Sequence, residues 1–307
     1  MSTDIGLWAV PLAMLGGAIR VSTPFLFVSL GEVITERSGR INLGLEGTLV
    51  FGAMSGYATA VLTGSPWLGV GAAALAGAGF GLIHGLLCSL PKVNDIAVGI
   101  ALMLLGMGLA FYFGKPFIQP VAPDLPAFDL GFWSGLPQVQ AALKVNVLFV
   151  IGIALAFALA WALKKTRAGL VLRVVGDSSD AARALGIRPA RVRILATAFG
   201  GAMAGIGGSY LSLYYPGSWN EGISSGQGLI AVALVIFARW SPTACLGAAL
   251  LFGAAGALGP ALQSVGITGG YYLSYAAPYV LTLIVLVISS SKTAALTGAP
   301  RELSLTK

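Results

Sequence analysis

Nine long apolar runs are the feature that most constrains the fold of this chain of 307 residues. A helix rises 1.5 Å per residue, so about 20 apolar residues cross the roughly 30 Å hydrocarbon core of a bilayer. Inside lipid every backbone amide needs a hydrogen-bond partner within the protein, which favours helices over open strands. The sequence therefore predicts an all-α, polytopic membrane protein of about nine transmembrane helices. The runs are 8–33, 46–63, 67–90, 95–114, 145–163, 192–214, 226–239, 243–264 and 271–290.

Composition agrees with this class, because only 9% of the residues are charged, against about 25% in a soluble domain. Two irregularities leave a margin of one or two crossings. The run 226–239 is short and can be a broken or re-entrant segment, and Arg20 interrupts the first run. In transporters such breaks often mark the pathway.

The positions of the Lys and Arg residues predict the orientation. Alternating the nine runs across the membrane puts fifteen of the eighteen on one side and two on the other, with Arg20 inside a run. Cytoplasmic loops are the ones rich in Lys and Arg. We therefore expect the N-terminus outside and the C-terminus in the cytoplasm. The segment 164–193 holds eight of these residues and is expected to be cytoplasmic.

The net charge of +7 does not indicate a nucleic-acid partner, since no basic groove with interleaved aromatic residues is visible. Membrane lipid is the expected surrounding. Cys88 and Cys245 each lie inside an apolar run, so neither a disulfide framework nor a metal site is predicted. Clusters of His, Asp or Glu at metal-binding or acid-base spacing are also missing, which argues against a membrane enzyme and predicts no catalytic residues.

Two stretches of the chain resemble each other. SPWLGVGAAALAGA at 65–78 matches SPTACLGAALLFGA at 241–254 in its Ser-Pro start and its small residues. The predicted runs that contain them cross the membrane in opposite directions, as in transporters built from inverted halves. We expect a single permease domain, 1–307, with repeat-like halves at about 40–114 and 220–290. Chance similarity between Gly/Ala-rich stretches is the alternative.

Glycines also predict close helix packing. Gly77, Gly81 and Gly85 are four residues apart on one helix face, as are Gly201 and Gly205 in another run. Small residues at this spacing let two helix backbones approach in a membrane.

The segment 164–193 contains the pattern of a short helix. Asp177 can cap its start, Asp180 lies in its first turn, and Gly186 can end it. Tethered at both ends to membrane helices, such a helix is suited to lie along the membrane and present Leu185 and Ile187 to a partner. An ordinary interfacial helix is the alternative.

The string Asp180-Ala181-Ala182-x3-Gly186 resembles the EAA-x3-G motif in the permeases of ABC importers. In those proteins the motif lies on a cytoplasmic coupling helix that docks on the ATPase. Here Asp replaces Glu, and the downstream Ile-x-Leu-Pro is absent. We therefore expect a relative outside the group that defined the motif.

Three further stretches, 31–47, 92–102 and 226–242, resemble the branched-chain amino acid, ribose and nucleoside permease family. The most diagnostic string is GRINLGLEG at 39–47. The resemblance is greatest to the nucleoside or "simple sugar" branch, which works with basic-membrane-protein-type lipoprotein receptors. It implies a permease subunit of an ATP-driven importer in a bacterial inner membrane, with nucleoside as cargo. A ribose-type sugar, a branched-chain amino acid, or an ion-coupled secondary transporter are the alternatives.

The resemblance also implies the partners. These are an ABC-type ATPase, a second homologous permease, expected to be non-identical, and an external solute-binding protein. This chain has no G-x4-G-K-[ST] phosphate-binding loop, so ATP and magnesium are expected on the ATPase and no cofactor on this chain.

Polar residues in or near the runs are candidates for the solute pathway, because ionisable groups in hydrocarbon are costly unless paired or hydrated. Glu46 is the strongest candidate. It begins a run after a glycine-rich bend and could pair with Arg37 or Arg40, or cap a broken helix that faces the cavity. Asn42, Asn94, Ser225 and Gln227 lie at predicted helix starts, beside glycine or at the matching position of the repeat, and their side chains could bind solute or cap helices. The pathway candidates are Asn42, Glu46, Asn94, Ser225 and Gln227, and the ATPase-coupling candidates are Asp177, Asp180, Ala181, Ala182, Leu185, Gly186 and Ile187.

Overall fold

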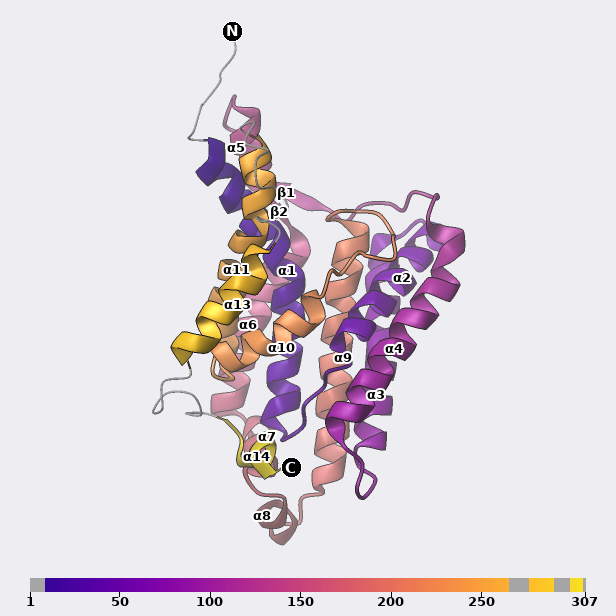
Figure 1. The fold of residues 1–307 in the computed structure, drawn as a ribbon, viewed down its shortest axis with the longest axis vertical. Helices are drawn as coiled ribbons and strands as arrows, with labels where there is room; N and C mark the ends of the chain where they lie inside the picture. The colour runs from indigo at the N-terminus through magenta and orange to yellow at the C-terminus, as the bar shows by residue number, and fades with distance from the viewer. Residues whose placement is uncertain (1–8, 265–275, 290–298, 306–307) are drawn as a thin grey trace.

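The computed structural model describes residues 9–264, 276–289 and 299–305, and within them the chain is almost entirely helical (Figure 1). The larger helices are α1 (Ala9–Arg37), α2 (Leu45–Thr63), α3 (Pro66–Leu87), α4 (Asp95–Gly114), α6 (Val147–Lys165), α9 (Pro189–Leu213), α10 (Gln227–Phe237), α11 (Pro242–Ser264) and α13 (Ala277–Ser289). The shorter elements are η2 (Lys115–Phe117), β1 (Ala127–Asp129), α5 (Pro137–Ala142), β2 (Lys144–Asn146), α7 (Arg167–Asp177), α8 (Ser179–Ala184) and α14 (Arg301–Leu305).

Seven of the helices in the described ranges are long and apolar enough to cross a membrane: α1, α2, α3, α4, α6, α9 and α11. They correspond to seven of the nine predicted runs. The run 226–239 forms α10, which has 11 residues and a length of about 16 Å, too short for a full crossing. The last run contains α13, of 13 residues, while 271–275 lie outside the described residues. The all-α, polytopic fold is thus confirmed.

The molecule has two distinct ends (Figure 1). At the α5 end lies the two-stranded ribbon, in which β1 pairs antiparallel with β2 and Ala127 faces Asn146. At the α8 end lie α7, α8 and α14. The basic segment 164–193 contributes α7 and α8, so its charge is concentrated at the α8 end.

Two helices begin inside the protein. After α1 reaches the α8 end, the segment 38–44 turns back and α2 starts between the two ends (Figure 1). After α9 reaches the α5 end, the segment 214–226 turns back in the same way, and α10 starts between the two ends. The two turned-back segments enter from opposite ends. Their helices, α2 and α10, are in contact.

Helix contacts occur in matching pairs. The helix pair α3 and α9 corresponds to the pair α11 and α1, and each pair is packed along its length. Likewise α2 contacts α9 and α4, while α10 contacts α1 and α13. Exchanging α1 with α9, α2 with α10, α3 with α11 and α4 with α13 therefore converts each contact among these eight helices into another that is present or into itself. This pattern supports an inverted repeat. The bounds 40–114 and 220–290 stay a prediction, because 265–275 lie outside the described residues.

The predicted glycine packing is confirmed between α3 and α9. A Cβ atom added to Gly77 would overlap the carbonyl oxygen of Gly201 and lie 3.0 Å from the Cα atom of Gly205. A Cβ atom added to Gly81 would overlap the carbonyl oxygen of Thr197. The two backbones are therefore in direct contact, as small residues allow in membranes.

We expect Gly77→Leu to destabilise the permease by about 1–3 kcal/mol or more, because the neighbour is backbone and cannot move aside. Gly79→Leu is the matched control: it lies on the same helix, and a Cβ atom there has nothing within 4 Å. Thermal unfolding of the two purified variants in the same detergent measures the difference. Equal midpoints would contradict the packing.

Candidate functional site

The carboxylate of Glu46 joins the two broken helices. Glu46 lies in the first turn of α2 and is only 5% exposed. Its Oε1 atom accepts hydrogen bonds from the Ser224 hydroxyl at 2.6 Å and from the Gly226 amide at 2.9 Å. Its Oε2 atom accepts from the Gly228 amide at 2.6 Å. The side chain of one broken helix thus caps the start of the other.

The local sequence explains this arrangement. Gly226, the residue before α10, has a φ of 80° and supplies no side-chain cap, so the first amides of α10 need another acceptor. A negative charge at a helix N-terminus is also favourable. At Gly228 an added Cβ atom would lie 2.6 Å from the Cα atom of Glu46. Glycine therefore lets the two helix starts approach closely.

Of the alternatives for Glu46, the contacts match the helix cap. Pairing with Arg37 or Arg40 is wrong. Arg37 donates from Nε and Nη2 to the Trp240 carbonyl at 3.2 and 3.1 Å, and Arg40 forms an ion pair with Asp95 at 2.5 Å. Arg37 is the last residue of α1 and Arg40 lies in the segment 38–44, both towards the α8 end. Glu46 lies in the interior, where the start of α2 meets the start of α10, a place that we call the junction.

Asn42 holds the turned-back segment 38–44. Its side-chain oxygen accepts from the backbone amide of Gly44 at 2.9 Å, and the backbone amide of Asn42 donates to Oε1 of Glu32 at 2.9 Å. Asn42 is 2% exposed, and Glu32 is fully buried. These contacts are internal, so they orient the backbone that leads to Glu46.

Sequence reasoning missed the carboxylates of Glu32 and Glu36, both buried in α1. The second Glu32 oxygen has no partner within the described residues, and Glu36 accepts from the Trp240 indole at 2.5 Å. Two acids four residues apart at the end of an apolar run lie on one helix face. Acids inside a span warrant a functional hypothesis, so this spacing could have identified them.

Ser225 and Gln227 lie at the same junction as Glu46. Ser225 is exposed, with a φ of 46°, and its carbonyl accepts from the Tyr279 hydroxyl at 2.7 Å. Gln227 is half-buried, and its side-chain oxygen has no partner in the described part of the chain. The hydroxyl that binds Glu46 belongs to Ser224, which sequence reasoning passed over.

Asn94 does not join this group. It caps α4, where its side-chain oxygen accepts from the amides of Ile96 at 2.8 Å and Ala97 at 3.1 Å. It lines a cavity together with Ile41 and Leu303. Asn94 therefore lies beside the segment that follows α1 and beside α14, apart from Glu46, Ser225 and Gln227.

The short helix predicted within 164–193 is present as α8, with one correction, and its coupling role stays a prediction. Its cap is Ser178, whose hydroxyl accepts from the Ala181 amide at 3.2 Å, while Asp177 is the last residue of α7. Ser178 has extended backbone angles, which turn the chain between α7 and α8. Gly186 ends the helix as predicted, with a φ of 77° and its amide 2.9 Å from the Arg183 carbonyl.

The coupling candidates divide between two faces of α8. Ala182 is fully buried, whereas Leu185 is 69% exposed. Ile187 is half-buried, and its amide donates to the Ala182 carbonyl at 2.9 Å. The remaining candidates are exposed: Asp177, Asp180, Ala181 and Gly186. The part of this segment that is open to solvent therefore consists of Leu185 and these four exposed residues.

Arg193 connects this helix to the rest of the protein, a role that the sequence did not reveal. Its Nε atom donates to the Ser38 carbonyl at 3.0 Å, and its Nη2 atom donates to the Ser179 hydroxyl at 2.8 Å. Nη2 also pairs with Glu302 of α14 at 3.2 Å. These contacts, which we call the Arg193 strut, join the start of α8 to the segment 38–44.

Glu302 reinforces the Arg193 strut. Its Oε1 atom accepts from the Ser179 amide at 2.7 Å. Burial raises the pKa of the Glu302 carboxyl. The hydrogen bonds from Ser179 and the charge of Arg193 lower this pKa by more than burial raises it, so the pKa is below its usual value. The carboxylate therefore stays ionised and keeps its charge-assisted bonds.

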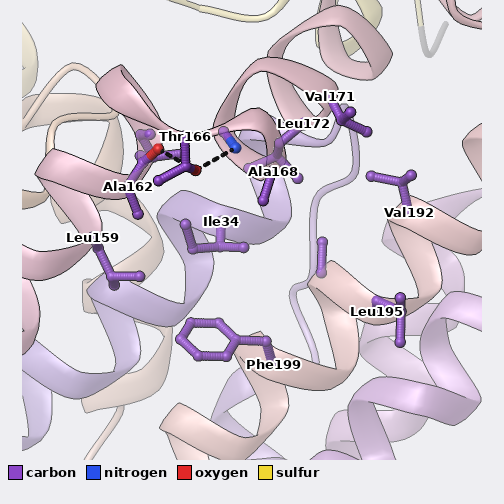
Figure 2. Close-up of a pocket in the computed structure, with 13 residues that line it drawn as sticks. Ile34, Leu159, Ala162, Thr166, Ala168, Val171, Leu172, Val192, Leu195 and Phe199 are labelled. Atoms are coloured by element: carbon purple, nitrogen blue, oxygen red, sulfur yellow. Dashed lines mark hydrogen bonds between the residues drawn. The ribbon is translucent and has the colours of Figure 1, made fainter.

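An apolar groove lies between α1, α6, α7 and α9 (Figure 2). Thr166 supplies the only polar side chain among the lining residues, and its hydroxyl is already bonded to the Ala162 carbonyl at 2.7 Å and the Gly169 amide at 3.2 Å. Figure 2 shows Ile34, Leu159 and Phe199 around the open space. The groove offers no free hydrogen-bonding side chain to a polar solute.

Comparison with known families decides the kind of membrane protein. A family model described as "Branched-chain amino acid transport system / permease component" matches residues 8–290. The chain belongs to this permease family. The family expected from the sequence is thus confirmed.

Three curated relatives have related transport names. The chain is 32% identical to the nucleoside ABC transporter permease NupC of Lactococcus lactis, over 88% of this chain and 90% of that protein. It is 32% identical to the guanosine ABC transporter permease NupQ of Bacillus subtilis, over 86% and 88%. It is 34% identical to the permease TsgC13 of Haloferax volcanii, provisionally named for glucose, over 83% and 79%.

A solved structure has a similar fold. It is an inward-facing conformation of an ABC transporter described as metal-chelate type, with a TM-score of 0.50 and 15% identity. The likeness covers 90% of this chain and 85% of that one. It supports the fold alone and carries no information on the solute.

We expect Glu46→Ala to destabilise the permease by at least about 3 kcal/mol, because three buried donors lose a charged acceptor. Glu221→Ala is the matched control, since Glu221 is an exposed acid in the segment 214–226. Unfolding of both variants in detergent measures the difference. A loss of stability that is equal in the two variants would argue against the cap.

Proposed function

We propose that this chain is one permease subunit of an ATP-driven importer for nucleosides. The supporting observation is the similarity to NupC and NupQ, both named for nucleoside transport, along almost the full length of the chain. The partners proposed are an ABC-type ATPase that binds ATP and magnesium, a second homologous permease, and an external solute-binding protein. No cofactor is assigned to this chain.

The pathway is proposed to follow the exposed side of the junction between α2 and α10. Non-helical backbone at membrane depth is stable only against protein or a water-filled cavity, and the segment that ends at Gly226 is of this kind. Ser225 is exposed there, and the side-chain oxygen of Gln227 is buried with no hydrogen-bond partner among the described residues, so a small movement at the junction would make it an acceptor for solute. Such groups can bind ribose hydroxyls or base N–H groups. Asn42 and Glu46 act on the backbone and are assigned no direct contact with solute.

The orientation proposed is the N-terminus outside and the α8 end in the cytoplasm of a bacterial inner membrane. The concentration of Lys and Arg in 164–193, at the α8 end, supports it. In this orientation the exposed surface of α8 meets the ATPase. The α5 end then meets the solute-binding protein.

A continuous set of contacts relates the two functions. Movement of α8 is transmitted by the Arg193 strut to Ser38 and the segment 38–44. That segment leads into α2, where Glu46 holds the start of α10. ATP-driven motion of α8 would therefore shift both broken helices and alternate access to the pathway.

A ribose-type or hexose sugar is the second candidate cargo. The permease TsgC13, with 34% identity, is the observation that favours it. A nucleoside contains a sugar, so the same hydroxyl-binding groups fit both, and only the base distinguishes them.

Uptake by the complete importer, reconstituted in vesicles, tests the cargo. We expect ATP-dependent uptake of labelled guanosine or uridine that unlabelled nucleosides block and that excess glucose, ribose or leucine leaves unchanged. Competition by sugars alone would favour the second candidate. Uptake driven by a proton or sodium gradient without ATP would contradict an ABC importer.

We expect Leu185→Arg to reduce solute-stimulated ATP hydrolysis and ATPase binding more than tenfold, because a charge replaces the exposed apolar side chain. A tenfold weaker binding corresponds to a loss of about 1.4 kcal/mol in binding free energy. Val121→Arg is the control, because Val121 is 87% exposed but lies in the connection between η2 and β1. Pull-down with the ATPase and hydrolysis assays check both variants. Normal coupling in Leu185→Arg would rule out α8 as the docking surface.

A further inference from the structure

A second polar site lies at the α8 end, apart from the junction and from the exposed surface of α8. It is a pocket of about 340 Å³ between the ends of α1 and α6, the middle of α7 and the start of α11. The lining residues are Arg37, Ala160, Leu163, Lys164, Arg173, Trp240, Ser241 and Pro242. We propose that this pocket binds the phosphate headgroup of an anionic phospholipid.

Three cationic side chains from three helices converge on the pocket. Arg37 donates from Nε and Nη2 to the Trp240 carbonyl, and Arg173 donates from Nε to the Gly169 carbonyl at 3.4 Å. Within the described residues no ion pair involves Arg37, Lys164 or Arg173. The three ion pairs found there are Arg40 with Asp95, Arg183 with Asp180, and Arg193 with Glu302. Donor groups on all three cations are therefore available to an anion.

Nearby acids do not neutralise this charge. The lining contains no Asp or Glu. Asp177, which interacts electrostatically with Arg37, is exposed to solvent at the end of α7. Glu36 lies on the buried side of Trp240 and is bonded to its indole. Like charges brought together repel, so a bound anion relieves the repulsion between Arg37 and Arg173.

The position of the pocket identifies the anion as a lipid headgroup. Arg37 is the last residue of one membrane span, Lys164 is the second-last of another, and Pro242 is the first of a third. The pocket thus lies at the edge of the hydrocarbon region, where phosphate groups are. Basic pockets between membrane helices bind anionic headgroups in this position.

Apolar surface continues from the pocket along α6. Ala160 and Leu163 form part of the lining. Trp161 is 63% exposed, and Phe157, one turn further into the span, is 59% exposed. Tryptophan is typical of the membrane interface, and an acyl chain can lie against these rings while the phosphate meets the cations. A free phosphate ion would gain nothing from contact with this apolar surface, whereas a lipid would.

Native mass spectrometry of the full-length chain in detergent tests the proposal with phosphatidylglycerol and phosphatidylcholine of identical acyl chains. We expect at least tenfold tighter binding of phosphatidylglycerol. In the double variant Lys164→Gln/Arg173→Gln that affinity should fall about thirtyfold, or about fivefold for each charge. The control Lys165→Gln/Arg167→Gln removes two exposed cations that do not line the pocket, and should change it less than twofold.

Three outcomes would overturn the proposal. They are equal binding of the two lipids, equal losses in the test and control variants, and displacement of phosphatidylglycerol by millimolar inorganic phosphate, which would indicate a free-anion site. If the double variant does not fold, Arg173→Gln alone serves, with an expected fivefold loss. The experiment requires no solute or ATPase, so its result is independent of the proposed importer function.

Discussion

The rest of the structure depends on one hydrogen-bonded charge, the Glu46 carboxylate at the start of α10. Two helices that begin inside the protein leave unpaired amides where lipid and water cannot easily satisfy them. Glu46 supplies the acceptor for Gly226 and Gly228 and also binds the Ser224 hydroxyl. The interaction therefore lets two helices begin inside the protein and fixes where α2 meets α10.

From this junction the contacts extend to the α8 end. The segment 38–44 is held by Glu32 at one point and by the Arg193 strut at another, and it leads directly into α2. At the same junction Ser225 is exposed, and the buried side-chain oxygen of Gln227 has no hydrogen-bond partner in the described part of the chain. The proposed importer needs both properties: a pathway wall that can move, and a connection from that wall to the surface on which the proposed ATPase partner would act.

Several features could be predicted from sequence because they are local. Apolar length predicted about nine spans, and seven of those runs form helices long enough to cross a membrane within the described residues. Gly186 predicted the end of α8, since a positive φ favours glycine. Asp177 and Ser178 are adjacent and both can cap, and backbone angles selected Ser178. Asn94 and Asn42 both precede a predicted helix, and only the folded structure shows that Asn94 lies apart from Glu46. The Arg193 strut joins residues far apart in the chain, and no local pattern indicates such a contact.

The central claim, that Glu46 binds the start of α10 across the junction, is tested most directly by a double-mutant cycle on Glu46→Ala and Ser224→Ala. Unfolding free energies of the wild type, both single variants and the double variant give the coupling energy. The contact at 2.6 Å predicts a coupling of about 1–3 kcal/mol, because a hydrogen bond to a charged acceptor is lost only once. Additive effects, with a coupling near zero, would contradict the account.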